Sequence, residues 1–373
     1  MLGLSLLTHQ MISSFTKRGA LSTAAACFVF ATIAWGQSTE KVLIKTLISG
    51  AGGLTFDQKG NLYGSDKKLT KFGAVYRLHR WPNGVWQKTI LYHFGGGSDG
   101  SSPNPYLVFD KAGNLYGATA EGGDGDRGTI FQLTPTPSLP WTKKVLYNFE
   151  LGPDGFFPSN VIIDDQGNLY GTTFLGPNGT IFELVRHGDG TFTHKVLYQF
   201  TGGADGGNPT TGLVRDSAGN LYGTTNSGGT TGHGAVFELS PEANGTWTFH
   251  LAYSFCSRTN CRDGAPAFGA SSVTLDSHGN LFGVTSYGGH TPLCEYSPSD
   301  SFGCGVAFKL THLRTGNWGW QLLYSFCSQY AVGPNGVRVD CADGAFPSGG
   351  LVLDQADRQR HPALPKVLCD SHC

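Results

Sequence analysis

Hydrophobic residues stand in short runs along this chain, separated by stretches rich in Gly, Asp, Asn and Ser. In one representative unit the runs cover residues 106–110, 114–119, 129–133 and 143–149. They are rich in aromatic and β-branched residues, which favour strands, and turn-forming residues lie between them. After residue 36 no segment keeps the i, i+3, i+4 spacing of a helix over three turns. The pattern predicts an all-β protein made of short strands.

The same pattern recurs five times. The motif Gly-Asn-Leu-Tyr/Phe-Gly has its asparagine at Asn61, Asn114, Asn168, Asn220 and Asn280, so the period is 53, 54, 52 and 60 residues. Four strands in a unit of about 50 residues match one blade of a β-propeller. We therefore predict a β-propeller of four-stranded blades over residues 41–354, with five full repeats and an incomplete sixth.

Each repeat carries two aspartates at fixed places. One stands three positions before the first glycine of the motif, at Asp57, Asp110, Asp164, Asp216 and Asp276. The other belongs to the Asp-Gly pair that finishes the unit, at Asp99, Asp154, Asp205, Asp263 and Asp343. Aspartate oxygens accept backbone N–H groups in tight turns, and glycine adopts positive φ there. We expect a structural role for both sets.

The composition is rich in glycine and poor in charge. The 373 residues include 55 Gly and 18 Pro, and only 14% are charged, against about 25% in an ordinary soluble domain. With 24 Phe, 14 Tyr and 7 Trp available for a core, a disordered chain is excluded. A net charge of −1 gives no electrostatic attraction to nucleic acid or to an anionic membrane surface. We expect neither as a partner.

The N-terminus has the pattern of a secretory signal peptide over residues 1–36, with Met11 as a second possible start. Lys17 and Arg18 precede an apolar stretch that ends in Ala34-Trp35-Gly36, which has small residues where signal peptidase cleaves. We predict cleavage before Gln37, with an uncleaved anchor as the alternative. No other segment is long and apolar enough to span a membrane. The sequence predicts a secreted or cell-surface protein.

Eight of the nine cysteines follow residue 255. In an exported chain disulfides are the first interpretation and zinc is the competitor, but no second close Cys-x2-4-Cys or histidine pair is present. Cys256 and Cys327 occupy equivalent repeat positions, and Cys261 and Cys341 follow them. Cys294 and Cys304 bracket a long spacer. We predict three local pairs, each contributing on the order of 2–3 kcal/mol.

The repeat resembles a known family. Asp-x-x-Gly-Asn-Leu-Tyr-Gly, a Gly-rich spacer, Gly-Thr-Ile-Phe-Glu-Leu and Val-Leu-Tyr-x-Phe are similar to the GloVer tandem repeat of exported bacterial proteins over residues 41–354. The resemblance implies a secreted or surface-anchored repeat protein and assigns no general activity. The Gly-Asn-Leu-Tyr core is also similar to other propeller families, including lactonase-like enzymes, in fold only.

The pattern breaks at both ends of the repeat domain. Residues 42–47 read like the last strand of a blade, and residues 350–354 begin a sixth unit. Asp357 and Arg358 then stand where the next Gly-Asn is due, and residues 355–373 form an irregular tail. We interpret this tail as frameshifted or truncated. We expect residues 42–47 to pair with the last, incomplete blade, because an unpaired strand invites aggregation.

Candidate binding residues lie in the Gly-rich spacers between strands two and three. In a propeller these spacers and the Asp-Gly loops emerge on one face, and the spacers differ at Asp124, Asp126, Arg127, His233 and His290. Asp124 and Asp126 are a candidate Ca²⁺ pair, but a calcium loop needs about six oxygens, so a solvated turn is the better interpretation. Phe156, Phe157, Phe174 and Tyr287 either stack on sugar rings or simply pack.

No catalytic motif is recognisable: the chain has no Gly-x-Ser-x-Gly elbow, His-Glu-x-x-His pair or phosphate loop. We therefore predict a non-catalytic binding or surface-display module for a glycan or a cell-surface protein, with no cofactor and no metal. The alternative is an exported propeller hydrolase or lyase acting on a carbohydrate or lactone. A third hypothesis is a structural spacer without a ligand face.

Overall fold

The computed structural model describes residues 53–209, 211–265, 273–289, 303–328, 341, 345–347 and 351. It also describes the backbone of residues 29–30, 39–40, 330–332 and 338–340. These residues form strands and two short 3-10 turns, η1 (Gly97–Asp99) and η2 (Thr259–Cys261), with no α-helix among them. Within this described part, no helix has the length and hydrophobicity to cross a membrane.

Five antiparallel sheets follow one another along the chain, and we call them blades one to five. Blade one contains β3 (Thr55–Phe56), β4 (Leu62–Asp66), β5 (Ala74–Arg80) and β6 (Trp86–His93). Blade two contains β7 (Ser101–Pro103), β8 (Val108–Phe109), β9 (Leu115–Glu121), β10 (Thr129–Thr134) and β11 (Thr142–Asn148). Blade three contains β12 (Phe156–Ile163), β13 (Leu169–Leu175), β14 (Thr180–Arg186) and β15 (Phe192–Gln199).

Blades four and five contain four strands each. Blade four contains β16 (Val214–Arg215), β17 (Leu221–Thr225), β18 (Ala235–Pro241) and β19 (Trp247–Ser254). Blade five contains β20 (Thr274–Leu275), β21 (Leu281–Thr285), β22 (Val306–His312) and β23 (Trp318–Ser325). Two further two-stranded sheets pair β1 (Val29–Phe30) with β2 (Thr39–Glu40) and β24 (Tyr330–Val332) with β25 (Arg338–Cys341).

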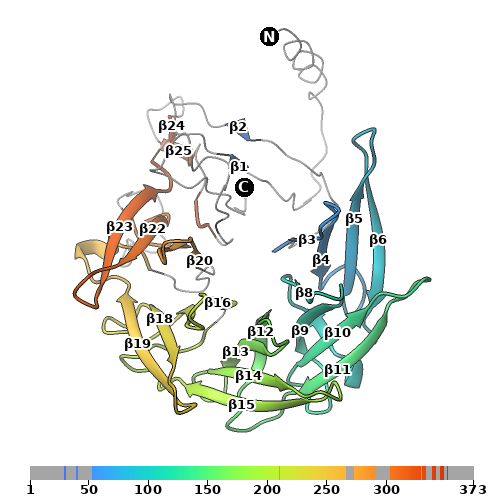
Figure 1. Ribbon diagram of the computed structural model, residues 1–373. Coiled ribbons are helices and arrows are strands. Elements are labelled where there is room, and N and C mark those ends of the chain that lie inside the picture. Colours follow the sequence, from blue (N-terminus) through green and yellow to red (C-terminus); the bar gives the residue numbers. More distant parts are fainter. Residues whose placement is uncertain are drawn as a thin grey trace.

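The blades stand around a common centre, with β3, β8, β12, β16 and β20 innermost and β6, β11, β15, β19 and β23 outermost (Figure 1). The predicted all-β propeller of four-stranded blades is confirmed. The strands predicted at residues 114–119 and 129–133 match β9 and β10 closely. Blade two departs from the pattern because β7 and β8 both pair with β9.

The Asp-x-x-Gly-Asn motif forms the turn that precedes the second strand of each blade, for example the turn between β8 and β9. In blade two, Asp110 Oδ1 accepts the backbone N–H groups of Ala112 and Asn114, each at 2.9 Å. Gly113 lies between them at φ 86°, which a residue with a side chain rarely adopts. The structural role predicted for this aspartate is therefore confirmed.

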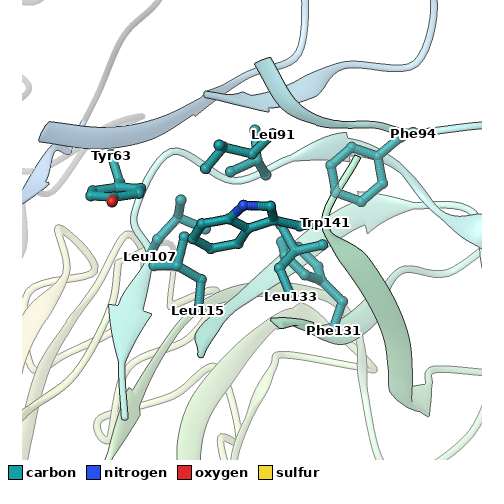
Figure 2. Close-up of a cluster of buried hydrophobic side chains, with 9 residues drawn as sticks. Tyr63, Leu91, Phe94, Leu107, Leu115, Phe131, Leu133 and Trp141 are labelled. Atoms are coloured by element: carbon teal, nitrogen blue, oxygen red, sulfur yellow. The ribbon is translucent and has the colours of Figure 1, made fainter. Parts of the chain in front are cut away.

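The hydrophobic core lies largely between neighbouring blades. One cluster joins Leu91 and Phe94 of blade one to Phe131 and Leu133 of blade two, with the Trp141 ring in its middle (Figure 2). The Trp141 backbone N–H also donates to the Leu91 carbonyl at 2.9 Å. Comparable clusters connect blades two and three, three and four, and four and five. Burial of apolar surface thus fixes each blade against the next.

Several predictions fall on residues that the structure leaves undescribed. These are the signal peptide cleavage site, the strand at residues 42–47, and the ends of the repeat domain at residues 41 and 354. The irregular tail at residues 355–373 is also outside the described residues. These expectations stay predictions.

Candidate ligand face

The turns between strands one and two use their carboxylates internally. Asp110 Oδ2 accepts hydrogen bonds from Asn114 Nδ2 at 2.7 Å and from the Tyr116 hydroxyl at 3.0 Å. Burial raises the pKa of the Asp110 carboxyl, but the hydrogen bonds from Asn114, Tyr116 and Ala112 outweigh it and hold the pKa below its usual value. The same Asp-Asn contacts recur at Asp57, Asp164, Asp216 and Asp276. These carboxylates already accept hydrogen bonds within their own turns.

The Asp-Gly aspartates are used in a similar way. The hydroxyl groups of Tyr92, Tyr147, Tyr198 and Tyr253 donate to Asp99, Asp154, Asp205 and Asp263, respectively. Asp263 is fully buried and also accepts the N–H of Ser257 at 2.9 Å. Burial, together with this carboxylate, raises the pKa of Tyr253 to about 12, so its hydroxyl stays a donor. Within the described residues, these aspartates hold their loops, as predicted.

The spacers and the Asp-Gly loops lie together on one face. Spacer glycines donate their N–H groups to carbonyls of the preceding Asp-Gly loop: Gly123 to Gly97 at 2.8 Å, Gly229 to Gly203 at 2.9 Å, and Gly289 to Cys261 at 3.0 Å. The spacers of blades two, four and five are therefore each fixed to the loop that enters their own blade. We call the surface formed by the spacers and Asp-Gly loops the loop face, and the surface of the Asp-x-x-Gly-Asn turns the turn face.

One position of the loop face differs in every blade. It is the residue before the glycine that precedes the third strand of the blade, and we call it the spacer-end position. In successive blades it holds Phe72, Arg127, Asn178, His233 and Cys304. Its backbone carbonyl accepts an N–H from the next loop, as in Phe157 to Arg127 at 2.9 Å and Asn208 to Asn178 at 2.7 Å. A similar backbone thus holds five different side chains, of which Cys304 is buried and the other four are partly exposed.

The predicted residues of blade two lie close to one another but have different contacts. The exposed Asp124 accepts a hydrogen bond from Asn148 Nδ2 at 2.9 Å, and the exposed Asp126 accepts the Gly122 N–H at 3.0 Å. Asp126 thus braces its own loop and Asp124 ties the loop to the end of β11, which favours the turn interpretation over a calcium pair. The half-buried Arg127 instead points its guanidinium at the Phe156 ring, 5.4 Å from the ring centre.

The two histidines lie away from this group. His233 belongs to the junction of blades four and five, where it lies next to the disulfide between Cys256 and Cys261. Its Nδ1 is 2.8 Å from the Thr231 carbonyl oxygen. Arg127 and His233 thus occupy equivalent positions at different junctions, and His290 lies outside the described residues. Sequence spacing alone did not reveal this separation.

The structure contains two of the three expected disulfides. Cys256 is bonded to Cys261, and Cys327 is bonded to Cys341. Cys304 is also disulfide-bonded, and its expected partner Cys294 lies outside the described residues. All the described cysteines belong to the loop face, where the two disulfides close the loops before and after blade five and Cys304 lies in the spacer between them.

The rim aromatics have packing partners. Phe156 and Phe157 meet edge to face, with ring centres 5.2 Å apart, and Tyr287 lies 5.4 Å from Phe346. Phe156, Phe157, Phe174 and Tyr287 are all half-buried. Packing therefore accounts for most of their surface, and each keeps an accessible part on the loop face.

The turn face has a feature that sequence reasoning missed. A cavity of about 540 Å³ opens between the turns of blades two and three, and Lys111, Asp165, Arg186 and Arg215 are among its lining residues. Lys111 and Asp165 form an exposed ion pair at 2.8 Å across the two blades. Arg215 stands where the other repeats have Phe56, Phe109, Ile163 and Leu275. This exception to the repeat is the sequence feature that could have indicated the cavity. The turn face is therefore less uniform than its motif indicates.

The fold and the repeated loops define a β-propeller built from tandem sequence repeats. The sequence matches the Gloeobacter/Verrucomicrobia repeat over residues 49–294 and 178–357. The chain belongs to this repeat family, which confirms the resemblance seen in the repeat motif. No curated protein matches the chain.

Solved structures share the fold at low sequence identity. A protein from Lactobacillus plantarum is 14% identical, with a TM-score of 0.50 over 83% of this chain and 85% of that one. A streptogramin B lyase is 13% identical, with a TM-score of 0.47 over 90% and 94% of the two chains. A putative gluconolactonase is 14% identical, with a TM-score of 0.44 over 81% of each chain. Similarity at this level concerns the fold alone.

Proposed function

We propose that this protein is an exported, non-catalytic binding module whose loop face recognises a glycan or a cell-surface protein. The observation that carries the proposal is the spacer-end position, where Phe72, Arg127, Asn178, His233 and Cys304 stand on an equivalent backbone. A rigid, repeated scaffold that carries varied side chains on its loops is the usual arrangement of a recognition surface.

The chemistry around Arg127 fits recognition of a polar ligand. Its guanidinium is a planar group with several N–H donors, and it lies over the half-buried ring of Phe156. Binding sites commonly combine an aromatic surface with a few well-placed polar groups. The pair at this junction therefore supplies a flat apolar surface and hydrogen-bond donors side by side.

The state of the repeated carboxylates supports binding over catalysis. A metal-assisted lactonase site needs carboxylate or amide ligands that differ from blade to blade. The described members of the two repeated aspartate sets instead accept hydrogen bonds from residues of their own repeat, as Asp110 and Asp263 do. Export is supported by the N-terminal sequence pattern and by the disulfides of the loop face.

The test is a ligand screen with the oxidised protein. The wild-type chain is applied to a glycan array and to a bacterial cell-surface protein extract, and the same samples are incubated with lactones and polysaccharides to detect turnover. We expect specific capture without turnover. If the screen detects no ligand, the binding hypothesis fails and the spacer hypothesis replaces it; if a lactone or polysaccharide is consumed, the enzyme alternative is correct.

A further inference from the structure

The junction of blades four and five brings a histidine onto a disulfide. A ring nitrogen of His233 and the sulfur atoms of Cys256 and Cys261 all lie within 4.8 Å of one another. His233 comes from the spacer of blade four, Cys256 follows β19, and Cys261 ends η2. Cys256 is half-buried, whereas Cys261 is only 6% exposed. Three side chains of types that bind metals thus meet, one from the spacer of blade four and two from the loop that follows β19.

The next junction repeats this placement. Cys304 occupies the spacer-end position of blade five, and its sulfur lies within 4.8 Å of the sulfurs of Cys327 and Cys341. Cys327 is the repeat equivalent of Cys256, since each comes directly after the phenylalanine that follows the fourth strand. The fold therefore places the spacer-end side chain against the two loop cysteines at both junctions. The position of His233 follows from the backbone of the repeat.

The surroundings of His233 suit a metal ligand. A carbonyl oxygen only accepts hydrogen bonds, so the 2.8 Å contact with the Thr231 oxygen assigns the proton to Nδ1. This tautomer carries the lone pair of the neutral ring on Nε2. Histidines that bind metals commonly donate their other ring N–H to a backbone carbonyl in this way. Two thiolates and one imidazole form a donor set typical of zinc, with a fourth position left for water.

We propose that His233, Cys256 and Cys261 form a redox-controlled site for a thiophilic divalent cation such as Zn²⁺. The site is closed while the disulfide is intact. A small-molecule thiol attacks the half-buried Cys256 sulfur, and Cys261 leaves as the thiolate. A second thiol then releases Cys256, so that two thiols become one disulfide and the protein gains two cysteine thiols. Zn²⁺ displaces two protons from these thiols and binds the two sulfurs and the His233 ring.

This site does not require the second close ligand pair that a zinc site predicted from sequence spacing needs. The expected second ligand pair at short spacing is absent from the sequence, but the propeller supplies a histidine from the neighbouring spacer instead. The proposal is independent of the proposed function, because ligand capture by the loop face is measured on the oxidised chain without added metal.

The experiment is alkylation of single cysteines, read by mass spectrometry. The whole chain is reduced with a phosphine and treated with iodoacetamide in the presence and absence of Zn²⁺. Mass spectrometry of the resulting peptides distinguishes alkylation of Cys256 and Cys261 from that of Cys327 and Cys341. We expect Zn²⁺ to slow alkylation of Cys256 and Cys261 by about tenfold or more in the reduced wild type. His233→Ala should abolish this protection, whereas His250→Ala, which removes an exposed histidine of the same blade, should keep it.

Two results would overturn the proposal. One is equal alkylation of Cys256 and Cys261 with and without Zn²⁺ in the reduced wild type. The other is protection that survives His233→Ala, which would assign the metal to other ligands. Circular dichroism of each reduced variant checks folding, and if His233→Ala unfolds, His233→Asn repeats the test with a polar side chain of similar size.

Discussion

At the scale of single residues, the second glycine of the Gly-Asn-Leu-Tyr-Gly motif has a steric cause. A Cβ atom at Gly223 would come within 2.5 Å of the Phe237 ring, and the corresponding approach at Gly117 to Phe131 is 2.7 Å. The same contact recurs at Gly64, Gly171 and Gly283. The aromatic side chain on the third strand of each blade therefore occupies the space above the second strand, and only glycine leaves room for it.

Gly223→Ala should destabilise the protein by about 1–3 kcal/mol, because the added methyl group overpacks a fully buried ring. Gly223→Ala with Phe237→Leu should recover part of this loss, since the smaller side chain vacates the space. Thermal denaturation of the wild type, both single variants and the double variant measures the coupling. Additive losses would contradict the steric explanation.

A second position joins neighbouring blades. It lies two residues after the aromatic residue that begins the segment of the fourth strand. In successive repeats it holds Lys88, Lys143, His194, Phe249 and Trp320. The His194 ring stacks on Tyr147 of the preceding blade, with centres 4.4 Å apart, and lies 5.5 Å from Phe182 of its own blade. Its Nδ1 is 3.9 Å from Asp154, and its buried Nε2 makes no hydrogen bond. Burial lowers the pKa of His194, and Asp154 opposes this only in part.

This environment predicts acid sensitivity. Because the folded state disfavours the protonated ring, the unfolded chain binds more protons, and stability falls as the pH drops below the ordinary histidine pKa of about 6.5. Phe249, which fills the equivalent place in blade four, makes His194→Phe a matched replacement. We expect the fall in Tm between about pH 7.5 and pH 5.5 to be smaller in His194→Phe than in the wild type. Equal falls would rule out His194 as a source of the sensitivity.

At the scale of elements, the contact between blades carries much of the core. Trp141 is 9% exposed and contacts residues of blades one and two, whereas Trp81 is 48% exposed at a hairpin tip. Trp141→Ala should cost about 3–5 kcal/mol, and Trp81→Ala should stay within about 0.5 kcal/mol. Chemical denaturation measures both. Similar losses for the two variants would contradict the assignment of the core to the blade junctions.

The strands and turns could be predicted from the sequence because their causes are local. Short runs of apolar, aromatic and β-branched residues locate β9 and β10, and the aspartate and glycine of the turn act within five residues of one another. The partners of His194 and His233 could not be predicted in this way. Cys256 is brought next to His233 by the pairing of β18 with β19, and Tyr147, one repeat away, contacts His194 only because one blade packs against the next. The Arg215 cavity was missed for the same reason.

At the scale of the whole molecule, the two faces of the propeller are built differently. Hydrogen bonds of the same kind fix every turn on one face, and the other face varies at a fixed backbone position. The lysine and arginine residues around the turn-face cavity make the contrast incomplete. Selective binding nevertheless needs variation, and the loop face holds most of it.

Export is a prediction about the whole chain. Secreted protein should begin at Gln37, because Ala34 and Gly36 are the small residues that signal peptidase reads. N-terminal sequencing or intact mass measurement of secreted material determines the first residue. Retention of residues 11–36 would favour the uncleaved anchor.

The most direct measurement is the Kd of one captured ligand for the wild type and two double variants. Arg127→Ser with His233→Ser alters the loop face, and Lys111→Ser with Ser217→Ala alters exposed residues of the turn face. We predict that the loop-face variant raises Kd by about tenfold or more at unchanged β-sheet content, and that the turn-face variant stays within about twofold of the wild type. The reverse order, or two variants that bind like the wild type, would contradict the proposed binding face.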